Sequence, residues 1–237
     1  MQVLTVKKVN KKIKSKSILT DISFDMNAGE IVGLIGANGA GKTTLMKTLI
    51  GLTHFQSGEI QAPTHNKESD NEIGALIETP GIYPYLSGFD NLKLFNESKN
   101  NEHIQNIISK LKMEDFIQKK AKTYSLGMKQ KLGIAMALLN EPKLIILDEP
   151  MNGLDPRAVK DVRDVLVELA HKGVAILISS HMISELIKVT DSLLMIDKGQ
   201  IIKRTTMDEI TQTGEDVETI LLDIIDGKDG SRHASIN

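Results

Sequence analysis

Hydrophobic and polar positions along the chain change period from block to block, between the two-residue repeat of strands and the longer repeat of amphipathic helices. Short apolar runs predict strands at residues 3–9, 22–27, 30–36, 73–78, 143–150 and 173–181, and a strand pair within residues 191–204. Helical spacing predicts helices at residues 40–52, 156–173 and 217–225, and a mainly helical stretch over residues 88–140.

The order of these elements predicts the fold class. Buried strands that alternate with amphipathic helices form a parallel sheet with βαβ crossovers, so we expect an α/β fold. The helical stretch is too long for one crossover, and we interpret about residues 79–140 as an inserted helical subdomain. We expect a single domain over residues 1–237, with about residues 226–237 as a flexible tail.

Composition narrows the choice of partners. The net charge of −2 argues against nucleic acid, and the absence of cysteine excludes disulfides and thiolate metal sites. The N-terminus shows no secretory h-region, and no apolar run approaches the roughly 20 residues that span a bilayer. We therefore expect no signal peptide and no membrane crossing by this chain.

A lysine-rich segment separates the first two predicted strands. Six lysines lie within ten residues, namely Lys7, Lys8, Lys11, Lys12, Lys14 and Lys16. We interpret the segment as a solvated hairpin loop, with attraction to an anionic membrane face as the alternative.

A phosphate-binding motif follows the strand at residues 30–36. Residues 36–44, GANGAGKTT, match the P-loop pattern G-x-x-x-x-G-K-[ST] between a strand and a helix. Backbone N–H groups of the loop face the phosphates, Lys42 reaches the β/γ oxygens and the Thr43 hydroxyl ligates Mg²⁺. No N-K-x-D guanine motif occurs, so a GTPase is not expected. The predicted binding residues are Gly36, Ala37, Asn38, Gly39, Ala40, Gly41, Lys42, Thr43 and Thr44.

Two acids and a histidine follow later strands. Asp148 and Glu149 end the apolar run LIILDEP, and after a P-loop such acids hold Mg²⁺ and accept a proton from the attacking water, respectively. His181, in ISSHM, ends another buried strand. A lone histidine there is more often structural, but beside this set it predicts a hydrogen bond to the γ-phosphate.

A second helix start suited to an anion lies in YSLGMKQKLG, residues 124–133. Ser125 is a candidate N-cap and Gly127 follows it, so unpaired N–H groups and the positive end of the helix dipole are expected there. This start is far along the chain from Lys42, which raises the question of which anion it serves.

Five motifs in order resemble the nucleotide-binding subunit of an ABC transporter: the P-loop, YSLGMKQ, LIILDEP, MNGLDP and ISSHM. The resemblance covers about residues 2–225. It implies a P-loop NTPase fold with a RecA-like parallel-sheet core, an N-terminal antiparallel β subdomain and the inserted helical subdomain. Within the family, ALIETPGIYPYLSGFDNL and YSLGMKQKLGIAMALL most resemble the bacitracin and lantibiotic self-immunity ATPases of peptide exporters.

The resemblance also implies an answer to the question of the second anion. Two copies would pack head to tail, with each ATP between the P-loop of one copy and the signature helix of the other. Ser125 and the backbone at Gly127 would then meet the γ-phosphate held by Lys42 of the second copy. Asp155, in MNGLDP, is implied to lie at the dimer seam. ATP binding would close the dimer, and hydrolysis would remove the bridging charge.

Three features depart from the family pattern. The signature reads S-L-G-M where S-G-G-Q is usual, so that Leu126 replaces a glycine, and we expect its side chain to face away from phosphate. Glu78 replaces a glutamine, as in the lantibiotic-immunity group. We expect it to ligate Mg²⁺ with Thr43 and Asp148, to act in catalysis and to link the nucleotide site to the membrane partner. Ile13 replaces the adenine-stacking aromatic and offers no π-face, which predicts modest base discrimination.

These inferences predict an ATPase, converting ATP and water to ADP and phosphate, coupled to an ABC exporter that confers immunity to a lantibiotic-type peptide. The implied partners are two small hydrophobic transmembrane permease subunits and a second copy of the chain. The implied location is cytoplasmic, attached peripherally to the inner face of the cell membrane through those subunits. The alternatives are an ATPase of another small-molecule or drug exporter, and an ABC ATPase without a transporter.

Overall fold

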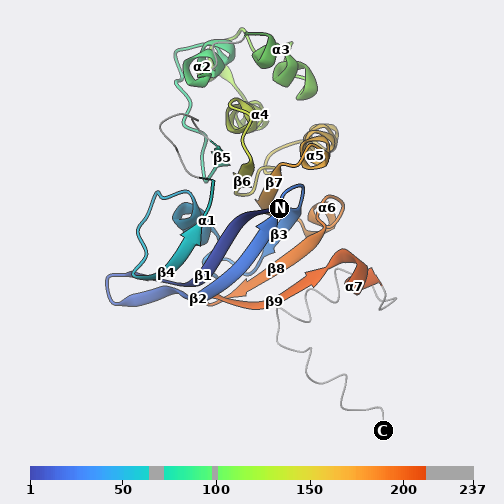
Figure 1. The fold of residues 1–237 in the computed structure, drawn as a ribbon. Coiled ribbons are helices and arrows are strands. Elements are labelled where there is room, and N and C mark those ends of the chain that lie inside the picture. Colours follow the sequence, from blue (N-terminus) through green and yellow to red (C-terminus); the bar gives the residue numbers. More distant parts are fainter. Residues whose placement is uncertain (64–71, 98–100, 212–237) are drawn as a thin grey trace.

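Two β-sheets make up the strand content of residues 1–63, 72–97 and 101–211, which the computed structural model describes (Figure 1). The smaller sheet is antiparallel, in the order β2-β1-β4, and the larger has the order β5-β6-β7-β3-β8-β9. The strands are β1 (Gln2–Ile13), β2 (Lys16–Asn27), β3 (Ile31–Ile35), β4 (Ser57–Gln61), β5 (Ile73–Leu76), β6 (Leu144–Leu147), β7 (Ala175–Ser179), β8 (Ser192–Asp197) and β9 (Gln200–Thr206).

The larger sheet is parallel from β5 to β8, with β9 antiparallel at one edge. Its inner strands are apolar on both faces because helices cover one face and a helix together with the antiparallel sheet covers the other. In β6, Ile145 and Leu147 pack into one apolar cluster, whereas Leu144 and Ile146 pack into another on the opposite face. The predicted α/β fold is therefore confirmed, including the antiparallel N-terminal sheet and the strand pair of residues 191–204.

Helices and a 3-10 turn connect the strands. They are α1 (Lys42–Leu49), α2 (Gly88–Phe95), α3 (Asn101–Lys110), η1 (Ala121–Thr123), α4 (Leu126–Leu138), α5 (Pro156–His171), α6 (Ile183–Leu186) and α7 (Met207–Thr211). Among the helices of the described ranges, none combines the length and apolar character needed to cross a bilayer. The helix predicted at residues 217–225 and the tail at residues 226–237 lie outside the described residues.

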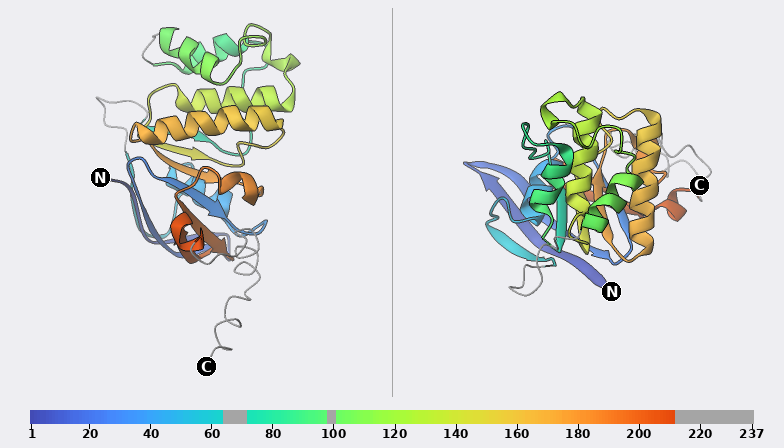
Figure 2. Two further views of the ribbon diagram at one scale, coloured as in Figure 1. Left: turned by 90° about the vertical axis from the view of Figure 1, so that its right-hand side faces the viewer. Right: turned by 90° about the horizontal axis from the view of Figure 1, so that it is seen from above.

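The helices form layers on the larger sheet (Figure 2). α4 and α5 cover one face, and α2 and α3 lie beyond α4, farthest from the antiparallel sheet. α4 approaches β5 backbone to backbone: a Cβ atom on Gly74 of β5 would lie 1.9 Å from the carbonyl oxygen of Ala137. Gly133, one turn earlier in α4, is in similarly close contact with Pro80. Residues 79–140 thus contain the predicted helices, and their description as a subdomain stays a prediction.

The lysine-rich segment is not a loop, contrary to the prediction. β1 runs to Ile13 and β2 begins at Lys16, so most of the lysines lie within the two strands. Lys11 is buried, and its Nζ donates to the Thr53 hydroxyl and the His54 carbonyl oxygen. Val9 and Lys11, two residues apart, are buried, whereas Lys8 and Lys12 are exposed. This is the two-residue period of a strand with one face in solvent, a signal that the density of charge obscured.

Glu168 of α5 joins two helical layers by ion pairs. Its Oε1 lies 2.5 Å from Lys110 Nζ of α3 and 2.6 Å from Lys172 Nζ, just after α5. The hydrogen bond from Lys110, followed by that from Lys172, lowers the pKa of the Glu168 carboxyl below its ordinary value. A lowered pKa means that the folded state favours the charged form, so this stabilisation is present above the unfolded-state pKa of about 4.3.

We predict that Glu168→Gln lowers the free energy of unfolding at pH 7 by at most about 1 kcal/mol, because the pair is partly exposed to solvent. The difference from the wild type should close as the pH falls through the lowered pKa of Glu168. Urea unfolding at pH 7, 5, 4 and 3 measures this, with Glu114→Gln, an exposed carboxylate outside the ion pair, as the control. A difference that stays constant across this range would contradict the assignment.

Candidate active site

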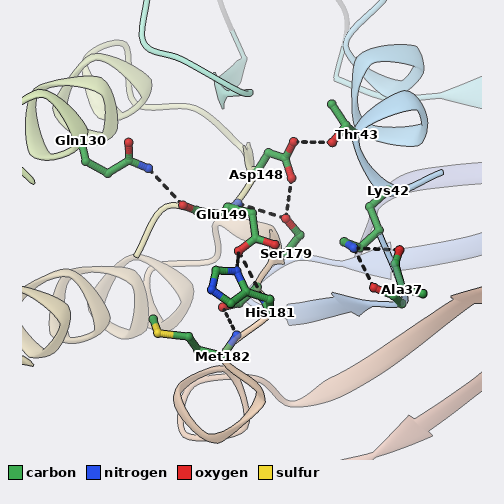
Figure 3. A network of polar contacts seen from close by, with 11 residues as sticks. Ala37, Lys42, Thr43, Gln130, Asp148, Glu149, Ser179, His181 and Met182 are labelled. Atoms are coloured by element: carbon green, nitrogen blue, oxygen red, sulfur yellow. Dashed lines mark hydrogen bonds and ion pairs between the residues drawn. The ribbon is translucent and has the colours of Figure 1, made fainter. Parts of the chain in front are cut away.

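The P-loop joins the end of β3 to the start of α1. β3 ends at Ile35 and α1 begins at Lys42, so the predicted residues 36–41 form the loop and Thr43 and Thr44 lie in the first turn of α1. Unpaired N–H groups of that turn and the helix dipole create a site for an anion. Lys42 Nζ donates to the carbonyl oxygens of Gly36 at 2.7 Å and Ala37 at 3.3 Å (Figure 3).

The turn between β8 and β9 supports the P-loop and is itself held by β2 of the antiparallel sheet. The N–H of Gly199, in the β8–β9 turn, donates to the Ala40 carbonyl oxygen at 2.8 Å, and the Gly199 carbonyl oxygen accepts from the Thr20 N–H of β2 at 2.8 Å. Ile13 lies at the end of β1, at the tip of the hairpin that β1 forms with β2, and half of its surface is exposed. The structure therefore places this apolar side chain in solvent reach, at the end of the strand pair that braces the P-loop.

Thr43 and Asp148 meet across the sheet edge, as predicted for a metal site. The Thr43 hydroxyl donates to Asp148 Oδ2 at 2.7 Å, and Asp148 is buried. A hydroxyl and a carboxylate are the hard oxygen ligands that Mg²⁺ prefers, with water and phosphate oxygens completing its octahedron. This pair of oxygens therefore fits Mg²⁺ next to the phosphates that the P-loop binds.

Glu149 is held through its N–H, its carbonyl oxygen and one carboxylate oxygen. Its N–H donates to Ser179 Oγ at 3.0 Å, and its carbonyl oxygen accepts from Gln130 Nε2 at 3.1 Å and from the Asn152 N–H at 3.2 Å. Its Oε2 accepts from both the N–H and the Nδ1 of His181, at 3.1 and 2.8 Å. The backbone of Glu149 is left-handed, with φ of 51°, a conformation that costs a non-glycine residue about 1–3 kcal/mol and persists where its surroundings determine it.

The contact of His181 with Glu149 limits what the imidazole can do. An ionised carboxylate only accepts hydrogen bonds, so Nδ1 of His181 carries the proton of this 2.8 Å contact. Nε2 is then free to donate to a phosphate only when the ring carries both protons. The pair joins the two groups that the sequence placed separately, at the ends of β6 and β7.

Ser179 is a candidate site residue that the sequence motifs did not single out. It is fully buried at the end of β7, and its Oγ donates to Asp148 Oδ1 at 2.6 Å while it accepts from the Glu149 N–H. One hydroxyl thus connects the predicted metal ligand to the backbone of the predicted base. The sequence signal that could have identified Ser179 was its place at the end of the apolar run AILIS, two residues before His181.

Glu78 does not contact Thr43 or Asp148 in this arrangement. Its carboxylate forms an ion pair with Lys47 Nζ of α1 at 2.8 Å, and its side chain is mostly exposed. Its backbone is left-handed, with φ of 60°, as at Glu149. Across the described residues, no three His, Cys, Asp or Glu side chains gather to hold a metal ion. The predicted role of Glu78 at the metal stays a prediction.

Ser125 caps α4 as expected. Its Oγ accepts from the Met128 N–H at 3.2 Å, and its own side chain is exposed. Leu126 is also largely exposed and lies over Gly153, where an added Cβ atom would come 2.5 Å from Leu126 Cδ2. Gly127 packs on the same loop, because a Cβ atom there would lie 2.8 Å from the Gly153 carbonyl oxygen.

Asp155 follows this loop and caps α5. Its Oδ1 accepts from the N–H groups of Arg157 and Ala158, each at 2.9 Å. These backbone hydrogen bonds, the one from Ala158 foremost, lower the pKa of the Asp155 carboxyl. Asp155, the residue that the motif MNGLDP singled out, is thus an exposed, charged cap of α5.

The sequence comparisons agree with this geometry. A family model described as ABC transporter matches residues 19–152. The chain is 43% identical to the uncharacterized ABC transporter ATP-binding protein YdbJ of Bacillus subtilis, over 90% of this chain and 72% of the relative. It is 37% identical to the lantibiotic transport ATP-binding protein SrtF of Streptococcus pyogenes (84% and 89%) and 34% identical to the bacitracin transport ATP-binding protein BcrA of Enterococcus faecalis (95% and 76%).

The structural comparison covers nearly the whole chain. A solved structure described as the ATP binding subunit of an ABC transporter superposes with a TM-score of 0.83 at 29% identity, over 93% of this chain and 98% of that one. The fold likeness therefore extends beyond the residues that the family model matches.

We predict that Ser179→Ala lowers kcat for ATP hydrolysis by about 10- to 100-fold, because Asp148 and Glu149 lose their shared support. It should also cost about 1–3 kcal/mol in the free energy of unfolding, since two buried polar groups lose a partner. Steady-state kinetics and urea unfolding measure the two effects. The matched control is Ser192→Ala, which removes a buried strand hydroxyl bonded to Glu30 at 2.9 Å. Equal losses of kcat in both variants would contradict a specific role for Ser179.

Proposed function

Because the chain belongs to the ABC transporter family as an ATP-binding, ATP-hydrolysing subunit, we propose that it drives an exporter of a lantibiotic-type peptide antibiotic as a nucleotide-sandwich dimer. The single observation that carries the mechanism is the connected network of Thr43, Asp148, Ser179, Glu149 and His181 beside the P-loop. This network puts the oxygens for a metal and a carboxylate for water at one sheet edge.

The proposed roles follow the positions of these groups. Lys42 and the N–H groups of residues 36–44 hold the β/γ-phosphates and stabilise charge as it develops on them. Thr43 and Asp148 hold Mg²⁺, which neutralises phosphate charge when it is bound. Glu149 orients the attacking water or accepts its proton, and His181 keeps that carboxylate in place and donates to the γ-phosphate when doubly protonated.

The proposed dimer explains why α4 begins with an exposed, capped end. Ser125 and Gly127 form no hydrogen bond with the P-loop of their own chain within the described residues. An anion at this helix start therefore has to come from elsewhere, and the ATP held by a second copy is the anion that the family resemblance supplies. ATP would then be part of the interface, so that its binding closes the dimer.

An apolar groove supports a permease as the membrane partner. Cavities of about 200 and 380 Å³ lie along β5, α4 and the end of α1. Large apolar side chains stand exposed around them, namely Leu52, Tyr83, Leu94 and Phe95. A segment of a transmembrane permease subunit that fills this groove would attach the chain peripherally to the inner face of the membrane. Two small hydrophobic permeases are the proposed form of that partner.

The peptide substrate is proposed from relatives. SrtF and BcrA are named for lantibiotic and bacitracin transport, whereas the more similar YdbJ carries no substrate in its name. Glu78 adds a residue-level argument, because it matches the lantibiotic-immunity pattern. Export of another small molecule is the second candidate, because the 43% identity to YdbJ points to no particular substrate.

We predict that Glu149→Gln lowers kcat for ATP hydrolysis by about 10²- to 10⁴-fold and accumulates an ATP-bound dimer, because the closed state forms but the water is not activated. Light scattering with and without Mg-ATP measures the dimer. Adding Ser125→Ala should abolish the dimer if the cap meets the partner's nucleotide. Glu114→Gln serves as the control. Hydrolysis by Glu149→Gln at the wild-type rate would refute the proposed base.

Glu78 lines a cavity of about 560 Å³ together with Glu149, Gln130 and Leu126. We predict that Glu78→Gln lowers both ATP turnover and resistance of cells to a lantibiotic peptide by about tenfold, because the shared cavity connects the site to the segment at residues 79–86. The matched control is Glu72→Gln, which breaks a similar ion pair with Lys143 at the other end of β5. If both turnover and resistance stay unchanged in Glu78→Gln, the linkage is wrong.

A further inference from the structure

Gln130 connects α4, which begins at the Ser125 cap, to Glu149 of the same chain. We propose that Gln130 is a positioning residue that couples the two nucleotide sites of the dimer, by tying the helix that serves the partner's ATP to the carboxylate that serves its own. This inference rests on the proposed sandwich dimer. None of the roles described so far requires Gln130.

The contact of Gln130 with Glu149 is buried and specific. Gln130 is 5% exposed in α4, and its Nε2 donates to the carbonyl oxygen of Glu149 at 3.1 Å (Figure 3). The acceptor belongs to the residue whose backbone is left-handed and whose carboxylate contacts His181. A shift of Gln130 along the helix direction therefore acts on the backbone of the proposed base itself.

A second contact joins the same helix to the same loop. Gln130 lies three residues after Gly127, so the two share one face of α4. On that face, Gly127 has no space for a Cβ atom, because the Gly153 carbonyl oxygen would lie 2.8 Å from it. The loop from Glu149 to Gly153 thus rests on α4 at both of its ends.

Ser125 lies at the beginning of the same helix. Five residues of α-helix separate Ser125 from Gln130, about 7–8 Å along the axis. In the proposed dimer, Ser125 meets the ATP of the partner, whereas Glu149 meets the ATP of its own chain. Binding at one site moves the start of α4, and the Gln130 hydrogen bond passes that displacement to the base at the other site.

The hydrogen bond can be removed without dismantling the loop. The Glu149 carbonyl oxygen keeps its second bond, from the Asn152 N–H at 3.2 Å, when the amide of Gln130 is lost. Gln130→Met preserves the length of the side chain and removes its amide, including the Nε2 donor, and Gln130→Leu is a second variant if the first folds poorly. Gln105→Met, on the exposed side of α3, is the matched control.

The test is the dependence of ATP hydrolysis on ATP concentration in the full chain assembled with its permease. For the wild type and Gln105→Met we expect a Hill coefficient of about 1.5 to 2, the upper bound being the number of sites. For Gln130→Met we expect a value of about 1, with the ATP affinity of the isolated chain unchanged in fluorescent-nucleotide binding. A role limited to the fold would lower the amount of active protein without changing the Hill coefficient.

Three results would overturn the inference: a wild-type Hill coefficient of about 1, an unchanged coefficient in both Gln130 variants, or a lower kcat in those variants with the coefficient intact. Failure of the proposed dimer is distinguishable from these. If Glu149→Gln forms no ATP-dependent dimer, the sandwich itself fails. If that dimer forms and Gln130→Met keeps the wild-type coefficient, only the coupling fails.

Discussion

Parallel pairing of β5, β6, β7 and β3 decides where every reactive group of this chain lies. The register sets Leu76 beside Leu147 and Leu147 beside Ile178, so these strands end together at one edge. Side chains that follow parallel strands meet at that edge whatever their separation in sequence. Asp148, Glu149 and His181 are thereby gathered next to the P-loop, which follows β3 in the same way.

The gathered acids need a scaffold because carboxylates at a buried edge are costly without partners. Ser179 supplies one hydroxyl to both Asp148 and the Glu149 backbone, and the Thr43 hydroxyl supplies a second bond to Asp148. Glu78 and Glu149 follow neighbouring strands by the same number of residues, and both have left-handed backbones. The backbone therefore turns in the same way after both strands, yet Glu149 contacts a histidine and Glu78 contacts a lysine.

Local pattern predicted most of the fold and the named motifs. The P-loop, the acids after β6, and the cap at Ser125 depend on neighbours within a few residues, and each lies where its motif indicated. Ser179 and Gln130 could not be found in this way, because their partners are 31 and 19 positions away and only the folded chain brings them together. The prediction of a loop at the lysine-rich segment was wrong for the opposite reason. Its charge suggested a loop, while its pairing across β1 and β2 depends on Val9 and Ile22 facing the core.

The contact of α4 with β5 has a mechanical consequence. Where Gly74 meets the Ala137 carbonyl oxygen, helix and strand lie backbone to backbone, and no flexible side chain lies between them to absorb sliding. A seam of this kind is stiff, because any relative displacement brings backbone atoms into overlap. The second half of α4 therefore travels with the sheet as one body. Displacement of the Ser125 end therefore has to arise before Gly133, in the first half of α4 and the segment that precedes it.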